Sequence, residues 1–152
     1  LHLNLPQTGT WIIGASSFQA GSSGTYNLSL ACSATPVCTP SATALCLHDL
    51  RFKVHATFAT SHGQSGTAQV QVLTDQTGYF WFFTSDNVEV VVKIINGCGL
   101  NNRYWVFAGG LTDVDTTITV TDMQTGSVET YTNPQGTAFQ PIQDTSAFAG
   151  CP

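Results

Sequence analysis

Residues 79–83 read Tyr79-Phe80-Trp81-Phe82-Phe83, five aromatic side chains in succession. The chain around them is rich in β-branched residues, so the run predicts a β-strand whose side chains point alternately to the two faces of a sheet. Both faces of that strand are then apolar. An antiparallel sheet in a small domain usually turns one face to water, so the second apolar face of this strand requires a cover.

The first residues of the sequence offer such a cover. Leu1, Leu3 and Leu5 alternate with His2 and Asn4, which is the period of two that predicts a half-buried strand. We interpret residues 1–37, which are rich in Gly, Ser and Thr, as an N-terminal arm and candidate donor strand, followed by one domain over residues 38–152. Two interpretations stay open: the arm pairs with its own sheet, or it inserts into a neighbouring copy.

The composition excludes several function classes. Charged residues make up 9% of the chain, against about 25% in ordinary globular proteins. With a net charge of −5, the chain lacks the basic surface that nucleic acid or anionic lipid would require, so neither is an expected partner. No apolar run reaches the roughly 20 residues that a membrane-spanning helix needs, so we do not expect a membrane-embedded protein.

The remaining sequence has the spacing of an all-β fold. Short strand patterns separated by Gly-rich or polar turns favour an antiparallel β-sandwich, either immunoglobulin-like or jelly-roll-like. We expect at most a turn or two of helix, near Thr145–Ala149. The predicted strands are Arg51–Thr60, Thr67–Leu73, Gly78–Phe83, Val88–Ile95, Arg103–Ala108, Thr116–Thr121 and Ser127–Thr132.

Five cysteines are present, at positions 32, 38, 46, 98 and 151. Together with the low charge, they favour an oxidising, extracellular setting, whether secreted or at a cell surface. No pair has the close spacing of a zinc site, so we expect no metal centre and no cofactor. The spacing leaves the disulfide connectivity open, and the odd count leaves one thiol over.

Several motifs beyond Cys38 resemble a domain of unknown activity that recurs in secreted and surface proteins of bacteria. The resemblance spans about three quarters of the chain. It is carried mainly by the runs GYFWFF (78–83) and RYWVFAGGLT (103–112), with Gly97-Cys98, Val120-Thr121-Asp122, Asn133-Pro134 and Pro141-Ile142-Gln143-Asp144-Thr145 in support. The resemblance implies a surface location and marks Cys38, Cys46, Cys98 and Cys151 as the usual cysteines, which leaves Cys32 as the odd one. It implies no catalytic residue.

Candidate reactive groups are sparse. His48-Asp49 and His55 are the nearest approach to a hydrolase triad, but no nucleophile elbow accompanies them, so we interpret both histidines as structural and expect no enzyme. Asp113 and Asp115, or Asp86, Asn87 and Glu89, are candidate calcium ligands. Neither group has the ligand density of an EF-hand loop, and capping of turns is the preferred interpretation.

Two features of the sequence suggest a role for carbohydrate, one as a ligand and one as a covalent modification. Tyr79, Trp81, Tyr104 and Trp105 are candidate stacking platforms for surface glycans, although their strand context favours packing in a core. Asn27 lies in an N-glycosylation sequon and is a candidate glycosylation site.

These observations favour a structural role over a chemical one. We expect a subunit of an extracellular bacterial filament or pilus-like fibre, a homo-polymer in which the arm carrying Leu1, Leu3 and Leu5 is given head to tail to the next copy. In mechanism this is similar to donor-strand pilins. The apolar strand surface that such an assembly covers comprises Tyr79, Phe80, Trp81, Phe82, Phe83 and Trp105. The alternative is a secreted carbohydrate-binding or adhesive module, which requires at least two aromatic side chains exposed together.

Overall fold

The computed structural model describes residues 21, 24–25 and 35–151. The chain divides into two units, Leu1–Ser33 and Ala34–Pro152. The predicted arm over residues 1–37 therefore lies almost entirely outside the described residues, as do Leu1, Leu3, Leu5, Asn27 and Cys32. The strands and the helix of the described residues all belong to the second unit.

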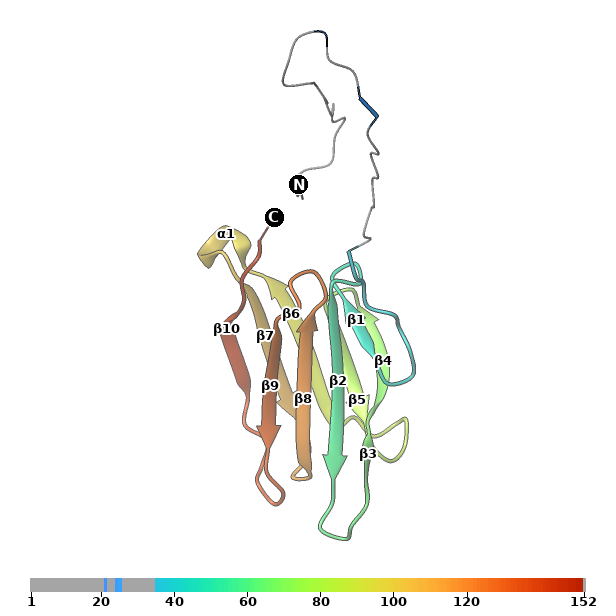
Figure 1. The fold of residues 1–152 in the computed structure, drawn as a ribbon. Coiled ribbons are helices and arrows are strands. Elements are labelled where there is room, and N and C mark those ends of the chain that lie inside the picture. The colour runs from blue at the N-terminus through green and yellow to red at the C-terminus, as the bar shows by residue number, and fades with distance from the viewer. Residues whose placement is uncertain (1–20, 22–23, 26–34, 152) are drawn as a thin grey trace. The chain divides into compact units, whose positions relative to one another are not determined.

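This unit is a sandwich of two antiparallel sheets (Figure 1), which confirms the predicted all-β fold. One sheet has the order β1-β2-β8-β9, with β3 also paired to β2, and the other has the order β10-β7-β6-β5-β4. The strands are β1 (Leu45–Leu47), β2 (Phe52–Ala59), β3 (Ser65–Thr67), β4 (Gln69–Thr74), β5 (Thr77–Trp81), β6 (Val90–Asn96), β7 (Tyr104–Gly110), β8 (Asp115–Asp122), β9 (Val128–Asn133) and β10 (Ile142–Phe148).

Each predicted strand range overlaps an observed strand, but the predicted helical turn at Thr145–Ala149 is wrong. That segment belongs to β10, where Asp144 pairs with Val106 and Phe148 with Tyr104. The polar sequence of β10 has little intrinsic strand preference, so its conformation comes from pairing with the edge of β7. Helix occurs in the described residues only as one turn, α1 (Cys98–Asn101), between β6 and β7.

The core lies between the two sheets and follows the alternation of the strands. Phe80 and Phe82 from the aromatic run point into it, and both are buried. The largest fully buried side chains are Phe52, Phe80, Phe148, Leu45, Leu47, Ile94, Ile118, Val54, Val90, Val92, Val106 and Val120. Both sheets contribute to this set, so neither sheet is stable without the other.

Two disulfides tie loops to the sandwich. Cys38 is bonded to Cys46 across the turn before β1, and Cys98 of α1 is bonded to Cys151 beyond β10. Such bonds are typical of proteins that fold in an oxidising compartment. Within the part of the chain that the structure describes, no helix has the length and hydropathy to cross a membrane.

Arg51 links the two sheets at the end of the sandwich that carries α1. Its Nε donates to Asp122 Oδ1 at 3.1 Å and its Nη2 to Asp122 Oδ2 at 2.7 Å, a two-point ion pair between the ends of β2 and β8. The same Nη2 donates to the carbonyl of Gly150, beyond β10, at 2.8 Å. The guanidinium also lies 4.3 Å from the ring centroid of Tyr104 in β7. One side chain therefore joins both sheets and the C-terminal segment.

A strained turn delivers Arg51 to this position. His48, Asp49 and Leu50 all have positive φ angles, of 51°, 52° and 66°, a conformation that is unfavourable for residues with a Cβ. Backbone hydrogen bonds hold the turn: His48 N–H donates to Asp75 O at 2.8 Å, and Cys38 N–H donates to Leu50 O at 2.7 Å. The strain persists because the surrounding contacts fix the turn on both sides.

The ion pair is buried, since Asp122 is 0% exposed and Arg51 is 6% exposed. Burial alone would raise the pKa of Asp122, but hydrogen bonds from Arg51 and from the Gln124 N–H, with the Arg51 charge, outweigh burial and hold that pKa below its usual value. Burial alone would lower the pKa of Arg51, and the bond to Asp122 reverses this. Both groups are therefore charged in the folded protein at neutral pH.

We expect Asp122→Asn to lower the free energy of unfolding by about 3 kcal/mol near neutral pH, because it leaves the Arg51 charge buried without a partner. Urea denaturation measures this difference. Because the folded pKa of Asp122 is depressed, its contribution is present above the unfolded pKa and is lost as the pH falls through the folded pKa, so acid should destabilise the wild type more than the variant. The control is Asp86→Asn, at an exposed position. Equal stability of the two variants would contradict this role for Arg51.

Candidate functional site: an aromatic sheet face

The outer surface of the β5-β6-β7 sheet carries large apolar side chains. We call it the aromatic face and define it as Tyr79, Trp81, Val91, Ile95, Trp105 and Phe107, all of which are half-buried. Strand pairing brings them together, since Tyr79 lies opposite Val91, and Ile95 lies opposite Trp105. Their neighbours in sequence point into the core, so this face lies on the solvent side of the sheet.

The aromatic run thus divides as its alternation predicts. Phe80 and Phe82 enter the core, Tyr79 and Trp81 lie on the aromatic face, and Phe83 is 42% exposed at the end of the run. Phe83 contacts Phe58 edge to face, at 5.4 Å between ring centroids. The four predicted sugar-stacking residues do not lie on one surface. Tyr104 is buried against Arg51, whereas Tyr79, Trp81 and Trp105 share the outer face.

Trp105 is fixed in place by the turn that contains α1. Its indole Nε1 donates to Asn101 Oδ1 at 2.8 Å. The ring lies so close to Gly97 that a Cβ at that position would overlap it. A glycine before α1 therefore lets the indole approach the backbone closely, and the hydrogen bond to Asn101 holds the ring there.

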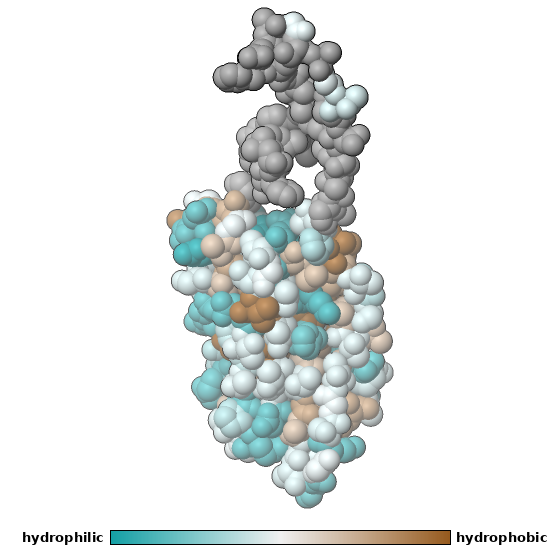
Figure 2. Space-filling view, viewed as in Figure 1, coloured by the Kyte–Doolittle hydropathy of each residue, from teal (hydrophilic) through white to brown (hydrophobic). Residues whose placement is uncertain are grey.

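The opposite face of the sandwich has a different chemistry. Thr67, Thr57, Thr117 and Thr132 form one row across β3, β2, β8 and β9, and Thr119 pairs with Thr130 in the next row. Figure 2 shows this side of the body as mostly teal and white, with isolated brown patches. The large apolar side chains on sheet faces are thus concentrated on the β5-β6-β7 side.

The two lateral edges of the sandwich also differ. On one side, the hydroxyl of Tyr131 in β9 donates to Asp144 Oδ2 in β10 at 2.9 Å, which closes the gap between the sheets with a polar contact. Burial and this carboxylate raise the pKa of Tyr131. On the other side, edge strand β4 exposes Val72 and Leu73, at 49% and 56%. An edge strand with exposed apolar residues is a template for pairing with another chain.

The two histidines have separate structural surroundings. The Nε2 of His48 lies 2.8 Å from the carbonyl oxygen of Ile94, and its ring packs edge to face on Phe52 and Tyr104. His55 lies on β2, where its Nδ1 is buried without a hydrogen-bond partner. Burial, with the nearby charge of Lys53, lowers the pKa of His55. His55 lines a pocket with the hydroxyl side chains of Ser41, Thr43 and Thr67, but its Nδ1 forms no hydrogen bond with any of them.

Hydrogen bonds link Glu89 and Asp113 to neighbouring loop residues, and none of these bonds is a carboxylate cap on a backbone N–H. The Asn87 amide donates to Glu89 Oε1, and the main-chain carbonyl of Asp113 accepts hydrogen bonds from the loop at Gln135 and Gly136. Across residues 35–151, no three His, Cys, Asp or Glu side chains are grouped so that they could hold a metal ion.

Comparison with known proteins does not assign the chain to a family. No protein-family model, no curated protein and no solved structure matches the chain.

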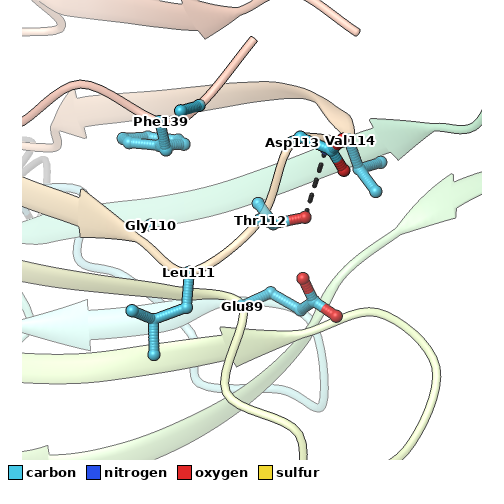
Figure 3. Close-up of a pocket in the computed structure, with 8 residues that line it drawn as sticks. Glu89, Gly110, Leu111, Thr112, Asp113, Val114 and Phe139 are labelled. Carbon is cyan, nitrogen blue, oxygen red and sulfur yellow. Dashed lines mark hydrogen bonds between the residues drawn. The ribbon is translucent and has the colours of Figure 1, made fainter. Parts of the chain in front are cut away.

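Sequence reasoning missed two features of the described unit. The Arg51–Asp122 pair joins residues 71 positions apart. Asp122 belongs to one of the runs that carry the resemblance, but nothing in that run indicates a partner so distant in the sequence. A pocket that brings Glu89 together with Leu111 and Phe139 (Figure 3) also draws on three distant segments. The one sequence signal for these features is the low number of charged residues. In a chain with so few charges, each charged residue is more prone to have a specific structural or binding role.

We expect Gly97→Ala to displace the Trp105 ring, because the added methyl group would occupy the space of the indole. The hydrogen bond to Asn101 would be lost, the indole N–H would exchange faster with solvent in NMR spectra, and stability would fall by about 1–3 kcal/mol. Gly109→Ala is the matched control, since a Cβ there meets nothing within 4 Å. An unchanged Trp105 N–H signal in Gly97→Ala would show that the glycine does not position the ring.

Proposed function

We propose that this protein is a structural subunit of an extracellular bacterial filament, assembled head to tail by donation of the N-terminal arm to edge strand β4 of the next copy. The observation that carries the proposal is the apolar outer edge of β4, which pairs with no further strand within the described unit. The two disulfides and the resemblance to bacterial surface proteins support the extracellular location.

Three observations define the acceptor edge. Val70 N–H donates to Ala42 O at 2.8 Å, so a loop already occupies the start of the edge. Val72 pairs with Gly78 of β5, which places its side chain toward the core side of the sheet, yet it remains half exposed. The register shifts between Val72 and Thr74, and Leu73 in this irregularity is exposed. The available stretch is therefore short, and it is apolar.

The sequence of the arm suits this edge. Leu1, Leu3 and Leu5 repeat with a period of two, so in an extended strand they share one face. A strand paired beside β4 with that face toward the core would place leucine side chains next to Val72. Each copy has one arm and one such edge, so the contact is heterologous, and its repetition gives a fibre rather than a closed dimer.

The sparse charge favours close contact between copies. Only Lys93 among the charged side chains projects from the middle of the sheet that carries the aromatic face, opposite Phe107 in β7. Copies that stack along a fibre would therefore bury the aromatic face with only this one charge to pair or desolvate.

A second function is favoured by the aromatic face itself. Tyr79, Trp81, Trp105 and Phe107 share one outer surface, although each is half-buried, so the face meets part of what an adhesive or carbohydrate-binding module requires. Ring faces of this kind suit the apolar faces of sugars. This function needs no arm and no second copy.

We expect the full chain to form rods in negative-stain micrographs, and Val72→Lys to weaken assembly at least about tenfold in light scattering, because a lysine on an edge strand opposes strand addition. Val128→Lys is the matched control, since Val128 is 52% exposed on edge strand β9. Leu3→Ser should weaken assembly as Val72→Lys does, because it removes the central leucine of the donor.

A monomeric wild type at high concentration would contradict the proposal, and so would equal loss of assembly in Val72→Lys and Val128→Lys. If the wild-type monomer binds immobilised polysaccharide instead, the adhesive function becomes the better account.

A further inference from the structure

A pocket of about 630 Å³ lies where β7 ends. Its lining comes from three segments: Glu89 before β6, the chain from Gly110 to Val114, and the residues Ala138 and Phe139 before β10. β10 pairs with β7 only as far as Ala108, so the edge of β7 at Gly110 has no neighbouring strand on that side within the described unit. The missing strand leaves an open hollow at this edge of the sheet.

The walls of this pocket are held by specific contacts. Gly110 has no side chain, and a Cβ there would overlap the Phe139 ring, so the glycine lets the ring close one side. The carbonyl of Asp113 accepts from Gly136 N–H at 2.7 Å, which joins the Thr112–Val114 turn to the β9–β10 loop. Leu111 N–H donates to Glu89 O at 2.7 Å. The site is therefore organised before any ligand arrives.

Glu89 is the unusual member of the pocket. Only 5% of the residue is exposed, and the hydrogen bond to its side chain comes from the neutral amide of Asn87, on Oε1. The ion pair of Arg51 with Asp122 is the only one found among residues 35–151, and no Lys or Arg lines the pocket. A buried carboxylate without a counter-charge is unfavourable, so this group favours any cation that reaches it.

The rest of the lining suits a cation on an apolar stem. Figure 3 shows the Glu89 carboxylate on the side of the Thr112–Asp113 turn, with the Phe139 ring on the far side of Gly110. Leu111 is 80% exposed at the rim, where a ligand would cover it. Asp113 contributes a second acidic group to the lining, and Val114 and Phe139 contribute apolar surface.

We propose that this pocket binds an alkylammonium group, with the nitrogen at the Glu89 carboxylate and the hydrocarbon against the apolar part of the lining. Asn87 already occupies Oε1, which leaves one oxygen for the ligand. A guanidinium pairs best with both carboxylate oxygens, whereas an ammonium is a point charge that needs only one. The site depends on the pocket alone and is independent of filament assembly.

Saturation-transfer NMR on the full chain tests this site, because the method reports on the ligand whether or not the protein is assembled. The probes are n-butylammonium and its neutral analogue n-butanol. We expect n-butylammonium to bind at least about tenfold more tightly than n-butanol, and Glu89→Gln to remove that preference, because a charged partner supplies it. Asp86→Asn is the control, since this exposed residue lies close in sequence but outside the pocket lining.

A blocked tripeptide, acetyl-Gly-Lys-Gly-amide, separates two sources of the same group. Tighter binding of the peptide than of n-butylammonium identifies a lysine side chain as the ligand, whereas equal or weaker binding identifies a free amine. Equal binding of n-butylammonium and n-butanol to the wild type would overturn the proposal, whatever the variants do. Unchanged selectivity in folded Glu89→Gln would also overturn it.

Discussion

The ion pair between Arg51 and Asp122 joins the two sheets at the end of the sandwich that carries α1. Its two charges come from one sheet, and the groups that surround them, the Tyr104 ring and the Gly150 carbonyl, come from the other sheet and its C-terminal extension. Water cannot replace these partners, because the carboxylate is fully buried. The disulfide from Cys98 to Cys151 ties down the same C-terminal segment. This end of the body is therefore fixed by one charge pair and one covalent bond.

The two sheets of the sandwich differ in the polarity of their outer faces and edges. The outer face with rows of threonines and the edge closed by Tyr131 and Asp144 are polar, and both are suited to water. The aromatic face and the β4 edge with Val72 and Leu73 are apolar, and both belong to the β10-β7-β6-β5-β4 sheet. The asymmetry of the two sheets is what favours an assembly or binding role, because exposed apolar surface is unfavourable in an isolated domain.

The sequence predicted the fold well where side chains alternate strictly. The aromatic run divided between core and outer face as its period of two requires, with Phe80 inside and Trp81 outside. The prediction from the sequence was wrong at β10. The polar stretch Gln143–Ser146 has no alternating pattern of its own and becomes a strand by pairing with β7. The sequence could not predict the Arg51–Asp122 pair or the Glu89 pocket, because both join segments that only the folded sheets bring together. Turn residues such as Gly97 show a similar limit, since the need for a glycine there arises from the Trp105 ring.

Hydrogen exchange along the wild-type chain, compared between dilute and concentrated protein, tests strand donation to β4 most directly. Strand donation predicts that the amides of Gln69–Thr74 become at least about tenfold more protected on assembly, while those of Val128–Asn133 on the opposite edge change little. Exchange at β4 that does not change with concentration, or equal protection of both edges, would contradict it.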